Sequence, residues 1–118
     1  MRTHICILSL LLVSLGPDAA CAHAFLDHAI PLVGSTVRAA PREVTLSFTQ
    51  DLEAGFSSVE VTDAHGARVD AGKPQVSANT MRIGLRTLAP GTYRVRWHVL
   101  SVDTHKTEGS FTFQVGGP

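Results

Sequence analysis

The chain has few cysteines, and they lie near its start, where they cannot form a disulfide within the following domain. Of its 118 residues only two are cysteines, Cys6 and Cys21, both within the first 22 positions. We therefore expect the rest of the chain to contain no disulfide, no thiolate nucleophile and no cysteine-based zinc site.

An excess of charge is also missing. Ten basic and ten acidic residues give a net charge of zero, and no run of like charge occurs. This balance argues against a nucleic-acid partner or a charged membrane surface. At this length the chain can build one small domain with a single core, which we expect to be a monomer.

No hydrophobic run is long enough to span a bilayer comfortably. The apolar run at residues 5–15 follows a weakly basic start and precedes the small residues 20–22. This is the layout of a secretory signal peptide, so we expect a leader at residues 1–22 and a domain at 23–118. Cleavage after Ala22 would leave His23 first, whereas cleavage after Ala24 would leave Phe25 first.

A helical period is absent beyond the leader, and apolar residues alternate with polar ones instead. This alternation predicts strands at residues 23–29, 44–49, 59–61, 81–85, 93–99 and 111–115, with a short return opening at Val69 and closing at Gly72-Lys73-Pro74. Residues 31–41 are expected to form a loop, and residues 50–55 a polar connection. About seven short strands separated by turns indicate an all-β, antiparallel, Ig-like Greek-key β-sandwich.

Aromatic residues are few, and we expect the two largest of them, Trp97 and Tyr93, to lie in the core. Trp97 is the only tryptophan and Tyr93 the only tyrosine. Trp97 is predicted to anchor the core, and Tyr93, shortly after a Pro-Gly turn, to form a tyrosine corner.

Asp103 and His105 occupy a short polar segment between the last two predicted strands. Residues two apart on an extended chain point the same way, so a carboxylate and an imidazole would face one point. Two ligands of a metal ion have this arrangement. On spacing alone, an aspartate in a turn beside a surface histidine is the more frequent explanation.

A mature N-terminus at His23 would supply two more nitrogen ligands, its free amine and its imidazole. With Asp103 and His105 these make a nitrogen-rich set containing one carboxylate. Such a set suits Cu(II) in tetragonal geometry, although zinc accepts the same ligand types as a tetrahedron.

The chain resembles the CopC family of periplasmic copper-resistance proteins. The resemblance rests on the leader ending before His23-Ala24 and on four segments, at residues 44–49, 89–97, 102–105 and 109–113. It implies that His23, Asp103 and His105 hold one Cu(II) ion per chain. It further implies that the protein is not an enzyme, and that it buffers copper or passes it to an inner-membrane transporter of the CopD kind.

Two departures from the family pattern bear on the site. Some members carry a glutamate near the copper where this chain has Gln50, followed by Asp51. Others carry a methionine-rich loop for Cu(I), whereas Met81 is the only methionine besides Met1. Thioethers select Cu(I), so the resemblance points to the Cu(II)-only kind. Whether Gln50, Asp51 or His28 adds a contact stays open at this level.

Two other classes remain as alternatives. A copper site built on an N-terminal histidine also serves enzymes that cleave polysaccharides oxidatively, but a chain with one Trp and one Tyr shows no flat aromatic surface for such a substrate. A metal-free β-sandwich that mediates an interaction is the other alternative.

Overall fold

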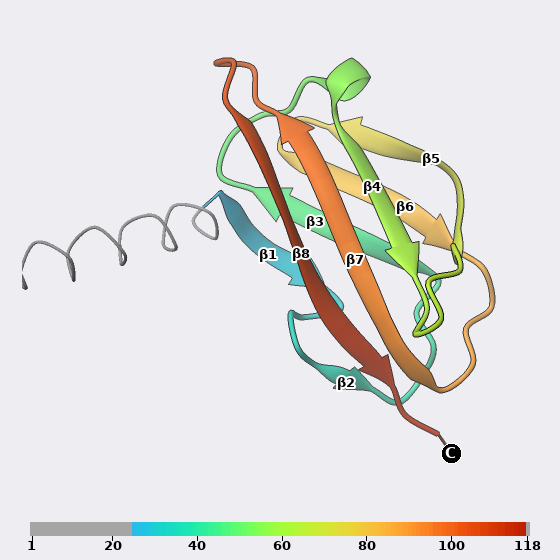
Figure 1. The fold of residues 1–118 in the computed structure, drawn as a ribbon. Coiled ribbons are helices and arrows are strands. Elements are labelled where there is room, and N and C mark those ends of the chain that lie inside the picture. Colours follow the sequence, from blue (N-terminus) through green and yellow to red (C-terminus); the bar gives the residue numbers. More distant parts are fainter. Residues whose placement is uncertain (1–24, 118) are drawn as a thin grey trace, which may run out of the picture.

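The computed structural model describes residues 25–117, which form eight strands and one 3-10 turn (Figure 1). The strands are β1 (Leu26–Ile30), β2 (Thr36–Val37), β3 (Glu43–Phe48), β4 (Ser58–Thr62), β5 (Asp70–Ser77), β6 (Thr80–Leu85), β7 (Gly91–Leu100) and β8 (Lys106–Val115), and the turn is η1 (Ala54–Phe56). Within this range no helix is long and apolar enough to cross a membrane. The predicted leader and His23 lie outside the described residues, so the boundary at Ala22 stays a prediction.

The strands form two four-stranded sheets packed face to face. One has the order β1-β3-β6-β5 and the other β2-β8-β7-β4. The predicted all-β, Ig-like sandwich is confirmed. It has eight strands, not about seven, because β2 lies within the expected loop at residues 31–41 and pairs with β8. This pairing is parallel, an exception to the predicted antiparallel arrangement.

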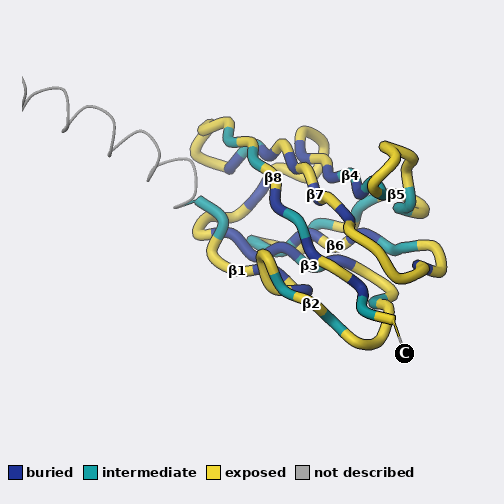
Figure 2. Tube along the Cα trace, turned by 60° about the horizontal axis from the view of Figure 1, so that its bottom comes forward, coloured by how far each residue is buried: buried dark blue, intermediate teal, exposed yellow. Residues whose placement is uncertain are grey.

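Alternating side chains of the two sheets fill the space between them. Figure 2 shows buried residues recurring along the strands, with exposed residues concentrated in the loops. On β7 the buried positions are Tyr93, Val95, Trp97 and Val99, as the sequence predicts. The hydroxyl of Tyr93 donates a hydrogen bond to the carbonyl of Ala89 at 2.5 Å, which is the predicted tyrosine corner.

Two local predictions were wrong. Gly72-Lys73-Pro74 does not end a short return, because β5 continues through it to Ser77. The strand lies at a sheet edge, where a proline costs no ladder hydrogen bond, and its register shifts between Ala71 and Gln75. The connection at residues 50–55 is not wholly polar, since Leu52 is buried and bridges to Ser101.

Candidate metal site

The loop that carries Asp103 and His105 joins β7 to β8 at one end of the sandwich (Figure 1). It is a tight turn and not extended chain. The amide of Thr104 donates to the carbonyl of Ser101 at 2.9 Å, and Thr104 itself has a φ of 71°. The prediction that the two side chains converge because they lie on an extended segment was therefore wrong in its geometry.

The turn nevertheless brings the two side chains together. Nδ1 of His105 lies 3.2 Å from Oδ1 of Asp103, and the side chains are 76% and 44% exposed respectively. Ligand atoms bound at about 2.0–2.1 Å to one ion lie about 2.8–3.4 Å apart in square or tetrahedral arrangements. The observed separation fits two neighbouring ligands of a single ion that approaches from solvent.

The carboxylate is kept in the charged form that a metal requires. The hydrogen bond from the Ser101 hydroxyl, and then the contact with His105, lower the pKa of Asp103 below its ordinary value. A metal ligand must be deprotonated, so a lowered pKa extends to more acidic pH the range in which the Asp103 carboxylate is free to bind a cation.

The connection between β3 and β4 lies alongside this loop and fixes its position. The amide of Val102 donates to the carbonyl of Asp51 at 3.0 Å, and the amide of Glu53 donates to the carbonyl of Leu100 at 2.8 Å. The buried Leu52 bridges to Ser101 between these two contacts. These contacts could not be predicted from side-chain chemistry, because they are made by backbone groups.

The start of the described chain lies at the same end of the sandwich. The carbonyl of Phe25 accepts a hydrogen bond from the amide of Thr49 at 3.0 Å, and the Phe25 ring packs on that of Phe48. Thr49 precedes by two positions Asp51, whose carbonyl contacts the β7–β8 loop, so Phe25 lies at the same end of the sandwich as that loop. His23 precedes Phe25 by two positions and lies outside the described residues.

The other candidate ligands do not join this pair in a cluster. Across residues 25–117, no group of three or more His, Cys, Asp or Glu side chains could hold a metal ion. His28 instead contacts its neighbour Asp27 at 3.1 Å on the exposed β1 edge, while Gln50 and Asp51 are exposed. Two of the three predicted ligands thus lie together, and the third, His23, lies outside the described residues.

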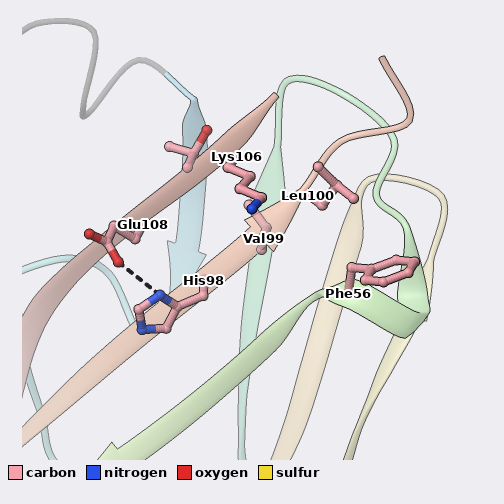
Figure 3. Close-up of a pocket in the computed structure, with 7 residues that line it drawn as sticks. Phe56, His98, Val99, Leu100, Lys106 and Glu108 are labelled. Atoms are coloured by element: carbon pink, nitrogen blue, oxygen red, sulfur yellow. Dashed lines mark ion pairs between the residues drawn. The ribbon is translucent and has the colours of Figure 1, made fainter. Parts of the chain in front are cut away.

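A second histidine–carboxylate pair lies on the outer face of β7 and β8. His98 and Glu108 lie opposite each other in the β7–β8 ladder, with Nδ1 of His98 2.8 Å from Oε1 of Glu108. The pair lies beside a shallow pocket that Phe56 and Lys106 also border (Figure 3). His98 alternates along β7 with the buried Trp97 and Val99, and its side chain is accordingly exposed. The pairing itself was missed, because it depends on the strand register.

Comparison with known proteins agrees with this architecture. The family model described as "CopC domain" matches residues 26–116, nearly all of the described chain. The chain belongs to the CopC family.

Individual relatives match this chain over most of their length. Protein YobA of Escherichia coli is 38% identical over 112 residues, which cover 92% of this chain and 90% of YobA. Copper resistance protein C of Escherichia coli is 36% identical over 107 residues, covering 82% of this chain and 84% of that protein. The crystal structure of CopC from Methylosinus trichosporium superposes with a TM-score of 0.74 at 32% identity, covering 80% of this chain and 95% of that one.

Proposed function

We propose that this CopC-family protein binds one Cu(II) ion per chain through His23, Asp103 and His105. The observation that carries the proposal is the Asp103–His105 pair, 3.2 Å apart at the end of the sandwich where the described residues begin. Nitrogen and carboxylate ligands of this kind suit Cu(II). One relative of similar length is named a copper resistance protein.

The preference for Cu(II) over Cu(I) follows from the absence of accessible sulfur. Met81 is fully buried on β6, and the sequence has no other methionine besides Met1 and no cysteine beyond Cys21. Cu(I) prefers thioether and thiolate ligands, and the surface of residues 25–117 offers it neither.

The proposed site places the protein's work in the periplasm, after removal of residues 1–22. Until then the nitrogen of His23 belongs to a peptide bond and cannot act as an amine ligand. In this role the protein is a copper carrier, not an enzyme. It buffers Cu(II) or passes it to an inner-membrane transporter of the CopD kind.

The decisive experiment compares a protein that begins at His23 with one that carries an added glycine before it. We expect the first to bind Cu(II) at one to one and the second to bind it far more weakly, because the amine becomes an amide. Affinity is measured by competition with a Cu(II) chelator, and ligation by electron paramagnetic resonance. Equal affinities and identical spectra would exclude the amine as a ligand.

The same assay tests the side-chain ligands. Asp103→Ala and His105→Ala should each weaken Cu(II) binding while leaving the thermal unfolding midpoint nearly unchanged, since both side chains are well exposed and the Ser101 hydroxyl keeps the carbonyl of His105 as an acceptor. His98→Ala is the matched control, because His98 also pairs with a carboxylate on β7 and β8. If both loop variants bind copper as the parent does, the site lies elsewhere. A parent that binds no copper would favour a metal-free interaction protein.

A further inference from the structure

Ser101, the first residue of the β7–β8 loop, is a polar residue with no exposed surface. It follows the last residue of β7, and its exposed fraction is 0%. Burying a hydroxyl group is unfavourable unless it is hydrogen-bonded, so the hydrogen-bond partners of Ser101 explain how a serine is accommodated at this position.

The Ser101 hydroxyl contacts both proposed ligand residues of the loop. It donates its proton to Oδ1 of Asp103, and it accepts the amide proton of His105 at 3.2 Å. A hydroxyl has one proton to donate and lone pairs to accept, so both bonds form together.

The backbone of Ser101 closes the same turn. Its amide donates to the carbonyl of His105 at 3.0 Å, and its carbonyl accepts from the amide of Thr104. On the other side, Leu52 bridges to Ser101 from the β3–β4 connection. Ser101 is therefore fixed in the body of the sandwich while its hydroxyl reaches into the exposed loop.

We propose that Ser101 is the positioning residue of the copper site, whose hydroxyl orients Asp103 and His105 before the ion arrives. This inference rests on the proposed function. Without the hydroxyl, the Asp103 side chain can rotate into solvent and the loop loses one of its amide contacts. Fixing the ligands in advance lowers the ordering cost of binding, and groups that orient metal ligands typically change affinity by about 10–100-fold when removed.

The test compares Ser101→Ala with Ser57→Ala in the protein that begins at His23. Ser57 is also buried, and its hydroxyl accepts from the amide of Leu100 at 3.2 Å, but it touches neither Asp103 nor His105. We expect Ser101→Ala to lower Cu(II) affinity by about 10–100-fold and to alter the electron paramagnetic resonance spectrum. Ser57→Ala should keep the parent's spectrum and affinity.

A second pair of variants separates the hydroxyl from the volume of the side chain. Ser101→Thr and Ser101→Val add nearly the same bulk, and only threonine keeps the hydroxyl. We expect the threonine variant to bind Cu(II) more tightly than the valine variant and to keep a spectrum closer to the parent's. Equal affinities and spectra for these two would overturn the proposal, even if Ser101→Ala proved too unstable to measure.

A measurement without copper distinguishes this inference from the proposed function. In the metal-free protein, Ser101→Ala should shift the NMR signals of the Asp103 carboxylate and the His105 amide, whereas Ser57→Ala should not. If Asp103→Ala and His105→Ala abolish copper binding but Ser101→Ala leaves it and these signals unchanged, the positioning role fails and the copper site stands. If the signals shift as expected but the parent binds no Cu(II), the proposed function fails.

Discussion

Gly109 makes room for the indole ring of Trp97. The two residues lie opposite each other in the β7–β8 ladder, and a Cβ atom at position 109 would lie 2.5 Å from Cζ2 of Trp97. The ring is 2% exposed and packs edge-on against Phe48, with ring centroids 5.3 Å apart. The indole therefore has little freedom to move away, and position 109 requires glycine.

Gly109→Ala should lower the free energy of unfolding by about 1–3 kcal/mol, the usual cost of overpacking a core. The matched control is Gly84→Ala on β6, where the added carbon would meet the carbonyl oxygen of Ala71 at 3.4 Å. That variant should be near neutral or slightly stabilising, because alanine reduces the entropy of the unfolded chain. Urea denaturation of both variants checks this, and equal losses would show that the Trp97 contact is not the cause.

At the level of single residues, the sequence predicted which two side chains meet but not how. Asp103 and His105 were predicted to converge, and they do, through a turn that spacing alone could not distinguish from a strand. Ser101 was missed because a serine beside a turn is common and because its bridge to Leu52 joins residues far apart in the sequence.

The carboxylate of Asp70, at the start of β5, links the two sheets where their edges meet. Its Oδ2 accepts the amide proton of Val61 on β4 at 2.7 Å, and both carboxylate oxygens accept from the Arg68 guanidinium at 2.9 Å. Its side chain is only 6% exposed. Burial by itself would raise the pKa of Asp70, but the bonds from Arg68 and Val61 outweigh it and lower the pKa.

This contact should make the domain sensitive to acid. A carboxylate whose folded pKa lies below its unfolded value of about 3.9 contributes stability above that value. The contribution is lost as the pH falls through the folded pKa. Asp70→Asn and Arg68→Gln should therefore be less stable than the parent at neutral pH, with the difference shrinking below about pH 4.

Chemical denaturation at a series of pH values measures this dependence. Arg82→Gln serves as the control, because Arg82 is an exposed arginine of β6. A stability difference for Asp70→Asn that stays constant from neutral pH to strong acid would show that the carboxylate's charge does not matter.

At the level of elements, the alternation of apolar and polar residues predicted which face of a strand is buried, but it predicted poorly where strands begin and end. The inward positions of β3, β6 and β7 follow from the sequence because each has apolar residues at every second place. β5 has no such pattern, and its Gly-Lys-Pro segment is typical of turns. β2 is two residues long, too short for any period to appear.

The proposed copper site would join two distant parts of the chain, the N-terminus and the β7–β8 loop. A ligand that binds only the folded state stabilises it by mass action, by about 2.7 kcal/mol at one hundred times its dissociation constant. Each kcal/mol raises the melting temperature by about 4–8 °C in a domain of this size.

Cu(II) should therefore raise the melting temperature of the form that begins at His23 by several degrees. The form with glycine before His23, and the Asp103→Ala variant, should show much smaller shifts. Differential scanning calorimetry with and without Cu(II) provides the measurement. Equal shifts in all three proteins would indicate nonspecific binding.

At the level of the whole molecule, the sandwich could be predicted but its strand order could not. Alternation shows which side chains point inward, and it contains no information about which strand lies beside which. The parallel pairing of Thr36 with Gln114 joins segments from opposite ends of the described chain, and only the structure reveals it.

That pairing has a consequence for when the protein can fold. In the sheet ordered β2-β8-β7-β4, the two strands latest in the chain lie in the middle, so β2 and β4 have no partner in this sheet until β7 and β8 are available. A chain that emerges N-terminus first cannot complete this sheet before residue 115 is free, and such long-range pairings form slowly. Until its last strand has been released, the sheet containing β7 and β8 cannot cover the apolar face of the β1-β3-β6-β5 sheet.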